Sequence, residues 1–385
     1  MREKFIEHCD VISGYAFKSA DLLDEGDVPI IKIGNISNGG DVIVDSSTQY
    51  VDSSFLKINE NYHIRKGDVL ISLTGSHINQ PNSMVGRTCR NYADNEFLLN
   101  QRAGRVIPKN DTSIDYLYYL FSSQAIKESI VTRAYGAANQ VNISPTAIGN
   151  IKWEFPNKEV QDKIGESLAI FDNLIMINNK RILILEQMAE NLYKEWFVRF
   201  RFPGHENAEF ENGIPKGWEY KKLDKVFEVK YGKDHKSIED GEIPILGSGG
   251  VMRFGNKALF SGESVLIPRK GSLNNIMYIN GDFWTVDTMF YTKLLINNIG
   301  KYTFYTLKNM DMGSYNSGAA LPSMTTDILY HLKILVPDDK TLVEFRCIVD
   351  VIYKQIEYLK KTNDNLITQR DLLLPRLMSG KLQVK

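Results

Sequence analysis

Residues 164–196 read IGESLAIFDNLIMINNKRILILEQMAENLYKEW, and apolar residues recur along this stretch in alternating steps of four and three. That alternation is the a/d heptad pattern of a coiled-coil helix. One polar residue, Asn178, interrupts the apolar series. The repeating positions are Ile164, Leu168, Phe171, Ile175, Asn178, Ile182, Leu185, Ala189, Leu192 and Trp196.

The same series returns 181 residues later, with Asn363 and Arg370 at polar places. It runs Phe345, Val349, Ile352, Ile356, Leu359, Asn363, Leu366, Arg370, Leu373 and Leu377. An amphipathic helix packed on its own domain is the alternative interpretation of either stretch. Two seams in phase favour pairing of the helices with each other, in antiparallel direction. Full overlap would place Asn178 and Asn363 in one layer, where buried Asn fixes the register.

The segments outside the helices also occur twice, in the same order, with offsets that drift only from about 218 to 181 residues. A repeat of this length identifies the architecture before any single motif does. The matched pairs are DVISGYAFKS (10–19) with EVKYGKDHKS (228–237), VPII (28–31) with IPIL (243–246), VLISLTGS (69–76) with VLIPRKGS (265–272), YLYYLF (116–121) with YTFYTL (302–307), and 136–156 with 318–337.

Short apolar runs between glycine-rich turns predict strands in each copy, and segments such as 113–130 predict helices. The fold class is therefore α+β: two similar mixed α/β heads, each followed by a long α-helix, with the two helices forming an antiparallel coiled coil of pseudo-twofold symmetry. The predicted parts are head one (1–155), the first long helix (156–202), a linker (203–217), head two (218–336), and the second long helix with the C-terminal tail (337–385).

The bulk properties indicate a soluble globular protein that is large enough for two domains. Its 385 residues carry a net charge of −1, which neither suggests nor excludes a nucleic-acid partner. Cys9, Cys89 and Cys347 stand far apart, which argues against a disulfide framework or a zinc ribbon. No apolar stretch is long enough to span a bilayer, and the N-terminus lacks the run of a signal peptide. We expect a cytoplasmic protein.

Two short motifs resemble catalytic signatures, but neither has the expected context. Residues 337–340 (PDDK) lie at a predicted helix start, where acidic side chains favour the helix dipole. The glycine-rich stretch 247–250 has no phosphate-loop partner and reads as a turn. We therefore predict no catalytic residue and no metal site.

Turn-like segments in both copies carry side chains suited to reading DNA bases or contacting phosphates. For any one of them a solvated loop residue is the alternative, but the correspondence between copies favours function. The candidates in head one are Lys18, Ser76, His77, Asn79, Gln80, Arg87, Asn100, Gln101, Arg102, Asn139 and Gln140. Those in head two are Lys233, His235, Lys236, Arg269, Lys270, Ser272, Asn274, Asn275, Tyr315, Asn316 and Ser317.

The ends of the helices carry aromatic and basic residues of the kinds that anchor protein interfaces. We predict partner contacts there, and packing against the protein's own head is the equal alternative. The residues are Tyr193, Trp196, Phe197, Arg199, Arg370, Arg376 and Lys381.

The chain resembles the specificity subunits of type I restriction–modification enzymes over its whole length. The resemblance depends on the duplicated heads, the tails ENLYKEWFVRF (190–200) and QRDLLLPRLMSGKLQV (369–384), and IPKGWEYKKL (214–223). FPNKEVQDKI (155–164), which opens the first helix, adds to it, although the second helix has Leu342 where the first has Gln161.

This resemblance implies a non-catalytic subunit in which each target-recognition domain reads one half of a split double-stranded DNA target. It implies two methyltransferase subunits bound to the helical spacer, and restriction subunits joining them. S-adenosylmethionine, ATP and Mg²⁺ would belong to those partners, and this chain would need no cofactor.

The loop tips differ between the copies, as SHINQP (76–81) against SLNNIM (272–277) illustrates, so we expect a bipartite and non-palindromic target. The first seam spans 32 rises, about 48 Å at roughly 1.5 Å each, and would set the spacing between the half-sites. Two alternatives are a two-headed scaffold that binds proteins and an orphan DNA-binding regulator.

Overall fold

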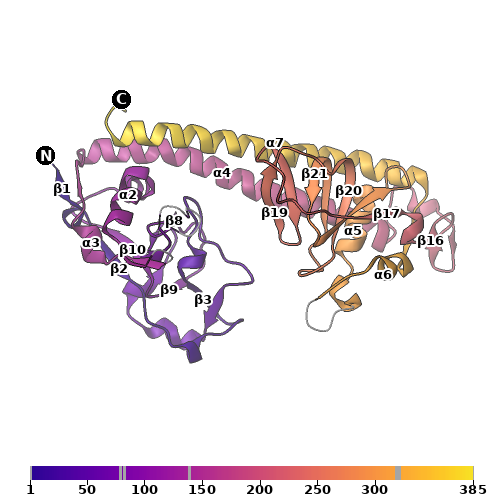
Figure 1. Cartoon of the computed structure of the whole chain (residues 1–385), viewed down its shortest axis with the longest axis horizontal. Helices are drawn as coiled ribbons and strands as arrows, with labels where there is room; N and C mark the ends of the chain where they lie inside the picture. The colour runs from indigo at the N-terminus through magenta and orange to yellow at the C-terminus, as the bar shows by residue number, and fades with distance from the viewer. Residues whose placement is uncertain (1, 78–79, 81–83, 138–139, 317–321, 385) are drawn as a thin grey trace. The chain divides into compact units, whose positions relative to one another are not determined.

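The computed structural model describes residues 2–77, 80, 84–137, 140–316 and 322–384. The chain divides into two compact units, one of residues 1–178 with 361–385 and one of residues 179–360. The two long helices, α4 (Lys158–Tyr193) and α7 (Asp339–Met378), each contribute one half to each unit (Figure 1). Each unit therefore consists of one head and a pair of half-helices.

Head one is built on two four-stranded sheets with orders β2-β10-β6-β8 and β4-β3-β9-β5. The first is antiparallel, and the second contains one parallel pair, β3 with β9. The strands are β2 (Cys9–Ser13), β10 (Ala103–Pro108), β6 (Val69–Ser72), β8 (Thr88–Arg90), β4 (Gln49–Val51), β3 (Val28–Ile31), β9 (Phe97–Leu99) and β5 (His63–Ile64).

Smaller sheets and helices complete this head. The sheets are β11 (Tyr135–Ala137) with β12 (Gln140–Asn142) and β7 (Thr74–Gly75), and β1 (Glu3–Lys4) with β13 (Lys152–Trp153). The helices are α1 (Ile114–Ser122), α2 (Gln124–Arg133) and α3 (Pro145–Gly149). The fully buried aromatic residues of α1 form one core with Ile164 and Leu168 of α4 and Leu377 of α7.

Head two has a single six-stranded sheet, order β17-β22-β20-β21-β18-β19. Its strands are β17 (Phe227–Tyr231), β22 (Met289–Leu294), β20 (Phe260–Pro268), β21 (Met277–Thr285), β18 (Ile243–Gly247) and β19 (Gly250–Gly255). Around it lie the pairs β14 (Phe210–Glu211) with β15 (Ile214–Pro215) and β16 (Glu219–Lys222) with β23 (Lys333–Val336), and the helices α5 (Gly300–Lys308) and α6 (Thr326–His331).

The two heads repeat one topology, as the matched sequence segments predicted. The antiparallel order β2-β10-β6 of head one returns as β17-β22-β20 in head two. The order β4-β3-β9, with its parallel β3–β9 pair, returns as β19-β18-β21, with a parallel β18–β21 pair. A mixed pairing pattern that recurs in the same chain order is strong evidence for duplication.

In the first unit, α4 and α7 pair in antiparallel direction through a buried polar layer. The Asn178 amide Nδ2 donates to Asn363 Oδ1 at 2.9 Å, and both side chains are buried. Seven residues further along α7, Arg370 pairs with Asp172 at 2.5 Å, and Tyr119 of α1 donates to the same carboxylate at 2.7 Å. The meeting of the two asparagines confirms the register predicted from the seams.

In the second unit, the other halves of the two helices pair in the same register. The rings of Trp196 and Phe345 lie 5.9 Å apart, and Ile182, Ile352 and Leu359 share the core. The number of residues from Trp196 back to Asn178 along α4 equals the number from Phe345 forward to Asn363 along α7. Both units therefore follow the full antiparallel overlap of the two seams.

The starts of the two long helices differ in the way their sequences suggested. Gln161 is buried, accepts from the Ser113 amide (3.0 Å) and donates to the Pro156 carbonyl (2.8 Å), so it ties α4 to α1. Leu342, at the matching place of α7, is fully buried in an apolar core. Of the helices in the described part of the chain, none combines the length and apolar character of a membrane span.

Candidate nucleic-acid interface

In head one, three of the segments marked as DNA readers are hydrogen-bonded together beside the end of β9. The Tyr15 amide donates to the Leu99 carbonyl (2.7 Å), and the Gln101 amide donates to the Tyr15 carbonyl (2.9 Å). The Leu73 amide donates to the Arg102 carbonyl (2.9 Å). The fold thus gathers segments that lie far apart in sequence.

A glycine makes this arrangement possible in each head. A Cβ on Gly14 would lie 2.2 Å from the Leu99 carbonyl oxygen, and one on Gly232 would lie 2.0 Å from the Val286 carbonyl oxygen. No side chain fits at such distances. The loop can therefore approach the strand end only if the residue before it is glycine. The two glycines occupy matching positions of the repeat.

Most of the predicted readers of head one that the structure describes are exposed, and Asn100 is half-buried. Gln140 lies on β12, which pairs with β7 directly before Ser76. Asn79 and Asn139 lie outside the described residues. The exposed candidates are Lys18, His77, Gln80, Gln101, Arg102 and Gln140.

The fold itself engages two of the candidate contacts of head one. Ser76 is buried, and its hydroxyl donates to the Gln80 carbonyl (2.9 Å). The hydroxyl holds the turn that presents Gln80. Arg87 is half-buried and donates to the Ile33 carbonyl (2.6 Å), and burial lowers the pKa of its guanidinium. The fold thus already engages Arg87 through a carbonyl.

In head two, the corresponding loops border a pocket of about 610 Å³ at the end of β18 and β21. His235 and Lys236 line it from one side, and Ser248 lines it from the turn after β18. Asn275 Nδ2 donates to the Ser248 carbonyl (2.8 Å), which joins the 272–275 turn to the same rim. The parallel strand pair therefore ends at the candidate interface in head two as it does in head one.

Other predicted readers of head two are anchored around this pocket. The Arg269 amide donates to the Thr288 carbonyl (2.8 Å), and its guanidinium lies over the Tyr231 ring at 5.3 Å. Asn274 donates to Asp311 (3.2 Å) and accepts from the Gly313 amide (2.9 Å).

The described candidates of head two divide into exposed and half-buried side chains, and Ser317 lies outside the described residues. The exposed ones are Lys233, Lys236, Ser272, Asn274, Tyr315 and Asn316; the half-buried ones are His235, Arg269, Lys270 and Asn275.

Sequence reasoning missed Arg253, which fixes the loop that carries His235. Its Nη2 donates to the carbonyls of His235 (2.6 Å) and Ile238 (2.7 Å), and its Nη1 pairs with Asp240 at 3.2 Å. A single arginine on a strand gives no signal of this role, because its partners are backbone carbonyls of another segment.

The aromatic residues at the end of α4 are buried, whereas a contact with a partner would need them at the surface. Tyr193, Trp196 and Phe197 belong to the core of the second unit. The Phe197 ring lies 4.7 Å from that of Tyr302 and 4.9 Å from that of Phe345. The alternative of packing against the protein's own head accounts for these three side chains.

Three basic candidates at the helix ends, Arg199, Arg376 and Lys381, are exposed. Arg199 pairs with Glu195 of the same helix, whereas Arg370 is mostly buried in its ion pair with Asp172.

Both long helices also expose aliphatic side chains away from the seam, a feature that the seam analysis did not include. In the first unit these are Ile170, Leu174 and Ile177 of α4 with Ile367 and Leu372 of α7. In the second unit they are Leu183, Ile184 and Met188 of α4 with Val343, Ile348 and Val351 of α7, and the aromatic Tyr358 of α7 is exposed as well. Where exposed apolar side chains form a contiguous patch, they are typical of an interaction surface.

The acidic stretch at 337–340 caps a helix. Asp338 accepts from the Thr341 amide (2.9 Å) and from Trp218 Nε1 (3.0 Å). Among the described residues, no group of three His, Cys, Asp or Glu side chains could hold a metal ion.

Comparison with known proteins agrees with this duplicated architecture. The sequence model of the family described as "Type I restriction modification DNA specificity domain" matches residues 6–187 and again 215–369. The chain belongs to this DNA specificity family. Its two matched regions each contain one head with part of a long helix.

Similar specificity subunits are known from an archaeon. The MjaIX specificity subunit of Methanocaldococcus jannaschii is 24% identical, with 94% of this chain and 88% of that protein covered. The MjaVIII specificity subunit of the same organism is also 24% identical, covering 88% and 86%. Among solved structures, the S subunit of a type I restriction–modification system from M. genitalium has a TM-score of 0.55 at 19% identity, covering 98% of this chain and 95% of that chain.

The α+β fold with two recognition domains and long helices is thus shared with specificity subunits. Like them, the chain acts in DNA recognition within type I restriction–modification systems and is not itself an enzyme.

Proposed function

We propose that the two heads read the two unlike halves of one asymmetric double-stranded DNA target, and that the paired helices set the distance between the halves. Two methyltransferase subunits would bind the helices, and restriction subunits would join that complex. The individual base and phosphate contacts proposed are the exposed and half-buried loop residues grouped around Gly14 and Gly232.

One observation carries this proposal: a repeated strand framework presents different side chains in the two heads. Gly14 and Gly232 let equivalent loops approach equivalent strand ends. The loop after Gly14 reads YAFK, and the loop after Gly232 reads KDHK. Because base readout depends on the donors and acceptors at the loop tips, equal frames with unequal tips suit two different half-sites.

Exchange of one head tests the proposal. Residues 1–155 would be replaced by the matching head of another specificity subunit, and modified bases would be mapped in cells that express the complete system. One half of the methylated sequence should change while the other half and the spacing are kept. An unchanged target in an active hybrid would contradict it.

The exposed aliphatic residues of the helices are the proposed docking surface for the methyltransferase subunits. Leu183 and Ile184 lie on α4 of the second unit, are more than half exposed, and stand outside the heptad seam. Replacing both with Glu should weaken methyltransferase binding by at least about tenfold, since burying a charge in an apolar contact is costly. Glu at Lys180, an already polar position, is the matched control, and equal effects of the two changes would count against the surface.

We propose that this chain binds no cofactor, so S-adenosylmethionine, ATP and Mg²⁺ belong to the partner subunits. A cytoplasmic location follows from a DNA target.

A filter-binding assay separates the alternatives. Specific duplex binding that requires a co-expressed methyltransferase supports the present proposal. Binding that is independent of the partner would indicate an orphan regulator, and no binding in either case would indicate a protein scaffold.

A further inference from the structure

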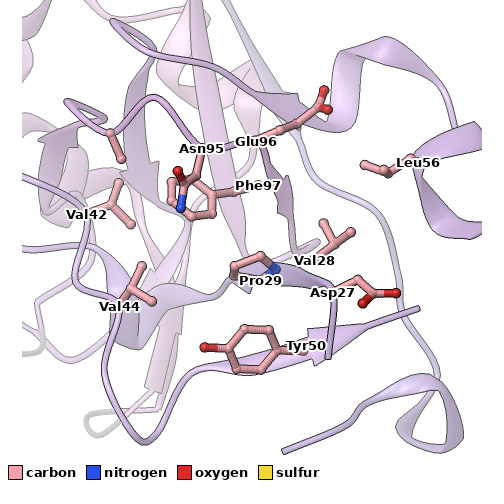
Figure 2. A pocket seen from close by; sticks show the side chains of 11 residues that line it. Asp27, Val28, Pro29, Val42, Val44, Tyr50, Leu56, Asn95, Glu96 and Phe97 are labelled. Atoms are coloured by element: carbon pink, nitrogen blue, oxygen red, sulfur yellow. The ribbon is translucent and has the colours of Figure 1, made fainter. Parts of the chain in front are cut away.

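Head one contains a pocket of about 710 Å³ that lies away from the predicted readers (Figure 2). It is formed where β3, β4 and the start of β9 meet. Val28 and Phe97 are its buried apolar lining, and Pro29, Val42 and Tyr50 add to its walls. A pocket of this size with apolar walls offers room for a ligand that carries apolar groups.

The strand directions place this pocket at the opposite end of the β3–β9 pair from the predicted readers. The pair is parallel, with Ile30 beside Leu98 and Ile31 beside Leu99. Val28 and Phe97 are the first residues of their strands, whereas Asn100 follows the last residue of β9. A ligand could therefore occupy the pocket while the other end of the pair faces DNA.

The charge around the pocket is unsuitable for DNA. The described residues that line it include Asp27 and Glu96 and no Lys or Arg. The segment 20–60, which supplies most of the lining, contains eight acidic residues and two basic ones. Phosphates would be repelled here, because nucleic-acid surfaces rely on positive charge.

One of the two carboxylates has no partner among the residues that the structure describes. Glu96 accepts a hydrogen bond from His63 Nδ1 (2.7 Å), so its carboxylate already has a partner within head one. Asp27 is exposed, and among the described residues none donates a hydrogen bond to it or forms an ion pair with it. Asp27 is therefore free to pair with a cation that enters the pocket.

Apolar side chains extend the surface beyond the pocket itself. Val44 and Leu56 line it and are 46% and 37% exposed, and the neighbouring Ile43 is 42% exposed. Figure 2 shows Val42 and Val44 on one side and Leu56 on the other, with Asp27 and Tyr50 between them. This surface is larger than one side chain can cover, which favours a peptide segment over a small amine.

We propose that this pocket binds a segment of a protein partner in which a lysine or arginine stands beside an apolar side chain. The apolar group packs on Val28, Pro29 and Phe97, and the cation pairs with Asp27. The aromatic face of Tyr50 offers the cation a further favourable contact. The inference uses the proposed function only to place DNA at the other end of the strand pair.

A photo-crosslinking amino acid at Val44 tests this inference in the assembled complex. The full chain would be combined with target DNA and with the methyltransferase and restriction subunits of its own system. We expect crosslinks to a protein segment that carries Lys or Arg next to an apolar residue. Crosslinks to DNA, or none to protein, would overturn the inference.

Charge reversal supplies the matched comparison. Asp27→Lys should lower the crosslink yield by at least about fivefold, because it places like charges together. Asp24→Lys makes the same change three residues away, outside the lining, and should lower it less than about twofold. Equal effects of the two variants would overturn the inference.

DNA binding by these complexes distinguishes the failure of this inference from failure of the proposed function. Both variants should bind the target as the unchanged complex does, and loss of DNA binding by Asp27→Lys alone would mean that the pocket belongs to the DNA interface. If the unchanged complex fails to bind DNA while the crosslink forms, the proposed function fails and the pocket assignment stands.

Discussion

At the scale of the residue, the close approach at Gly232 makes one methyl group decisive. A Cβ there would lie 2.0 Å from the Val286 carbonyl oxygen, so Gly232→Ala must displace the loop that carries His235 and Lys236. We expect a loss of about 2–4 kcal/mol in stability and at least tenfold in target affinity. Melting temperature and filter binding measure the two effects.

Gly249→Ala is the control for that substitution. Gly249 lines the same pocket, and nothing lies within 4 Å of an added Cβ. Its melting temperature should stay within a few degrees of the unchanged chain. If Gly249→Ala reduced affinity as much as Gly232→Ala, close packing of the loop would not be the cause.

Lys127 of α2 makes the stability of the first unit depend on pH, and a single substitution can test this effect. Its ammonium donates to Asn38 Oδ1 (2.6 Å), and burial lowers the pKa of Lys127 to about 8 from the usual 10.5. Between these values the unfolded chain holds a proton that the folded chain has released. Raising the pH from about 8 to 10.5 therefore stabilises the folded state through this residue.

Lys127→Met removes that dependence together with the cost of burying the charge. At pH 7 the variant should be more stable by about 1–3 kcal/mol, after allowance for the lost hydrogen bond to Asn38. The difference should shrink as the pH rises through the window above. Urea unfolding at several pH values measures it, and a difference that stays constant would contradict the assignment.

At the scale of the element, one buried amide layer specifies the register in which α4 pairs with α7. Asn178→Leu removes the donor that Asn363 Oδ1 accepts from, and should destabilise the first unit by about 1–3 kcal/mol. Replacing both asparagines with Leu fills the layer with apolar groups. The double variant should therefore be more stable to unfolding than the unchanged chain. Denaturant unfolding compares the variants, and equal stability of the single and double variants would refute a paired layer.

The sequence predicted this element better than it predicted the surfaces. Heptad spacing is local information, so the seam and the Asn178–Asn363 contact could be derived from position numbers alone. The burial of Trp196 could not, because an aromatic residue at a helix end suits both a partner contact and the protein's own core. Ser76 shows the same limit, since its hydroxyl turns inward to a carbonyl within its own turn.

At the scale of the whole molecule, duplication accounts for both what repeats and what differs. Each head contains the parallel strand pair, the glycine that precedes the loop (Gly14 or Gly232) and the matching helix (α1 or α5). These parts recur because they form the core and position the loops. The partners of the loops do not recur, since Arg253 and Asp240 fix one loop by contacts of head two only. The contacts that hold the proposed reading loops thus differ between the heads, as expected if the two heads recognise different bases.

The paired helices predict the spacing of the DNA target. Seven residues would be inserted between Asn178 and Ile182 of α4, and seven between Leu359 and Asn363 of α7, so that two complete heptad layers are added in register. Each insertion adds about 10 Å at roughly 1.5 Å per residue, which equals about three base pairs at roughly 3.4 Å each. The unread spacer between the two methylated half-sites should lengthen by about three base pairs.

Insertion into α4 alone is the control, because it offsets the seams and should abolish methylation. An active doubly extended chain with its original spacer would show that the helices do not set the distance.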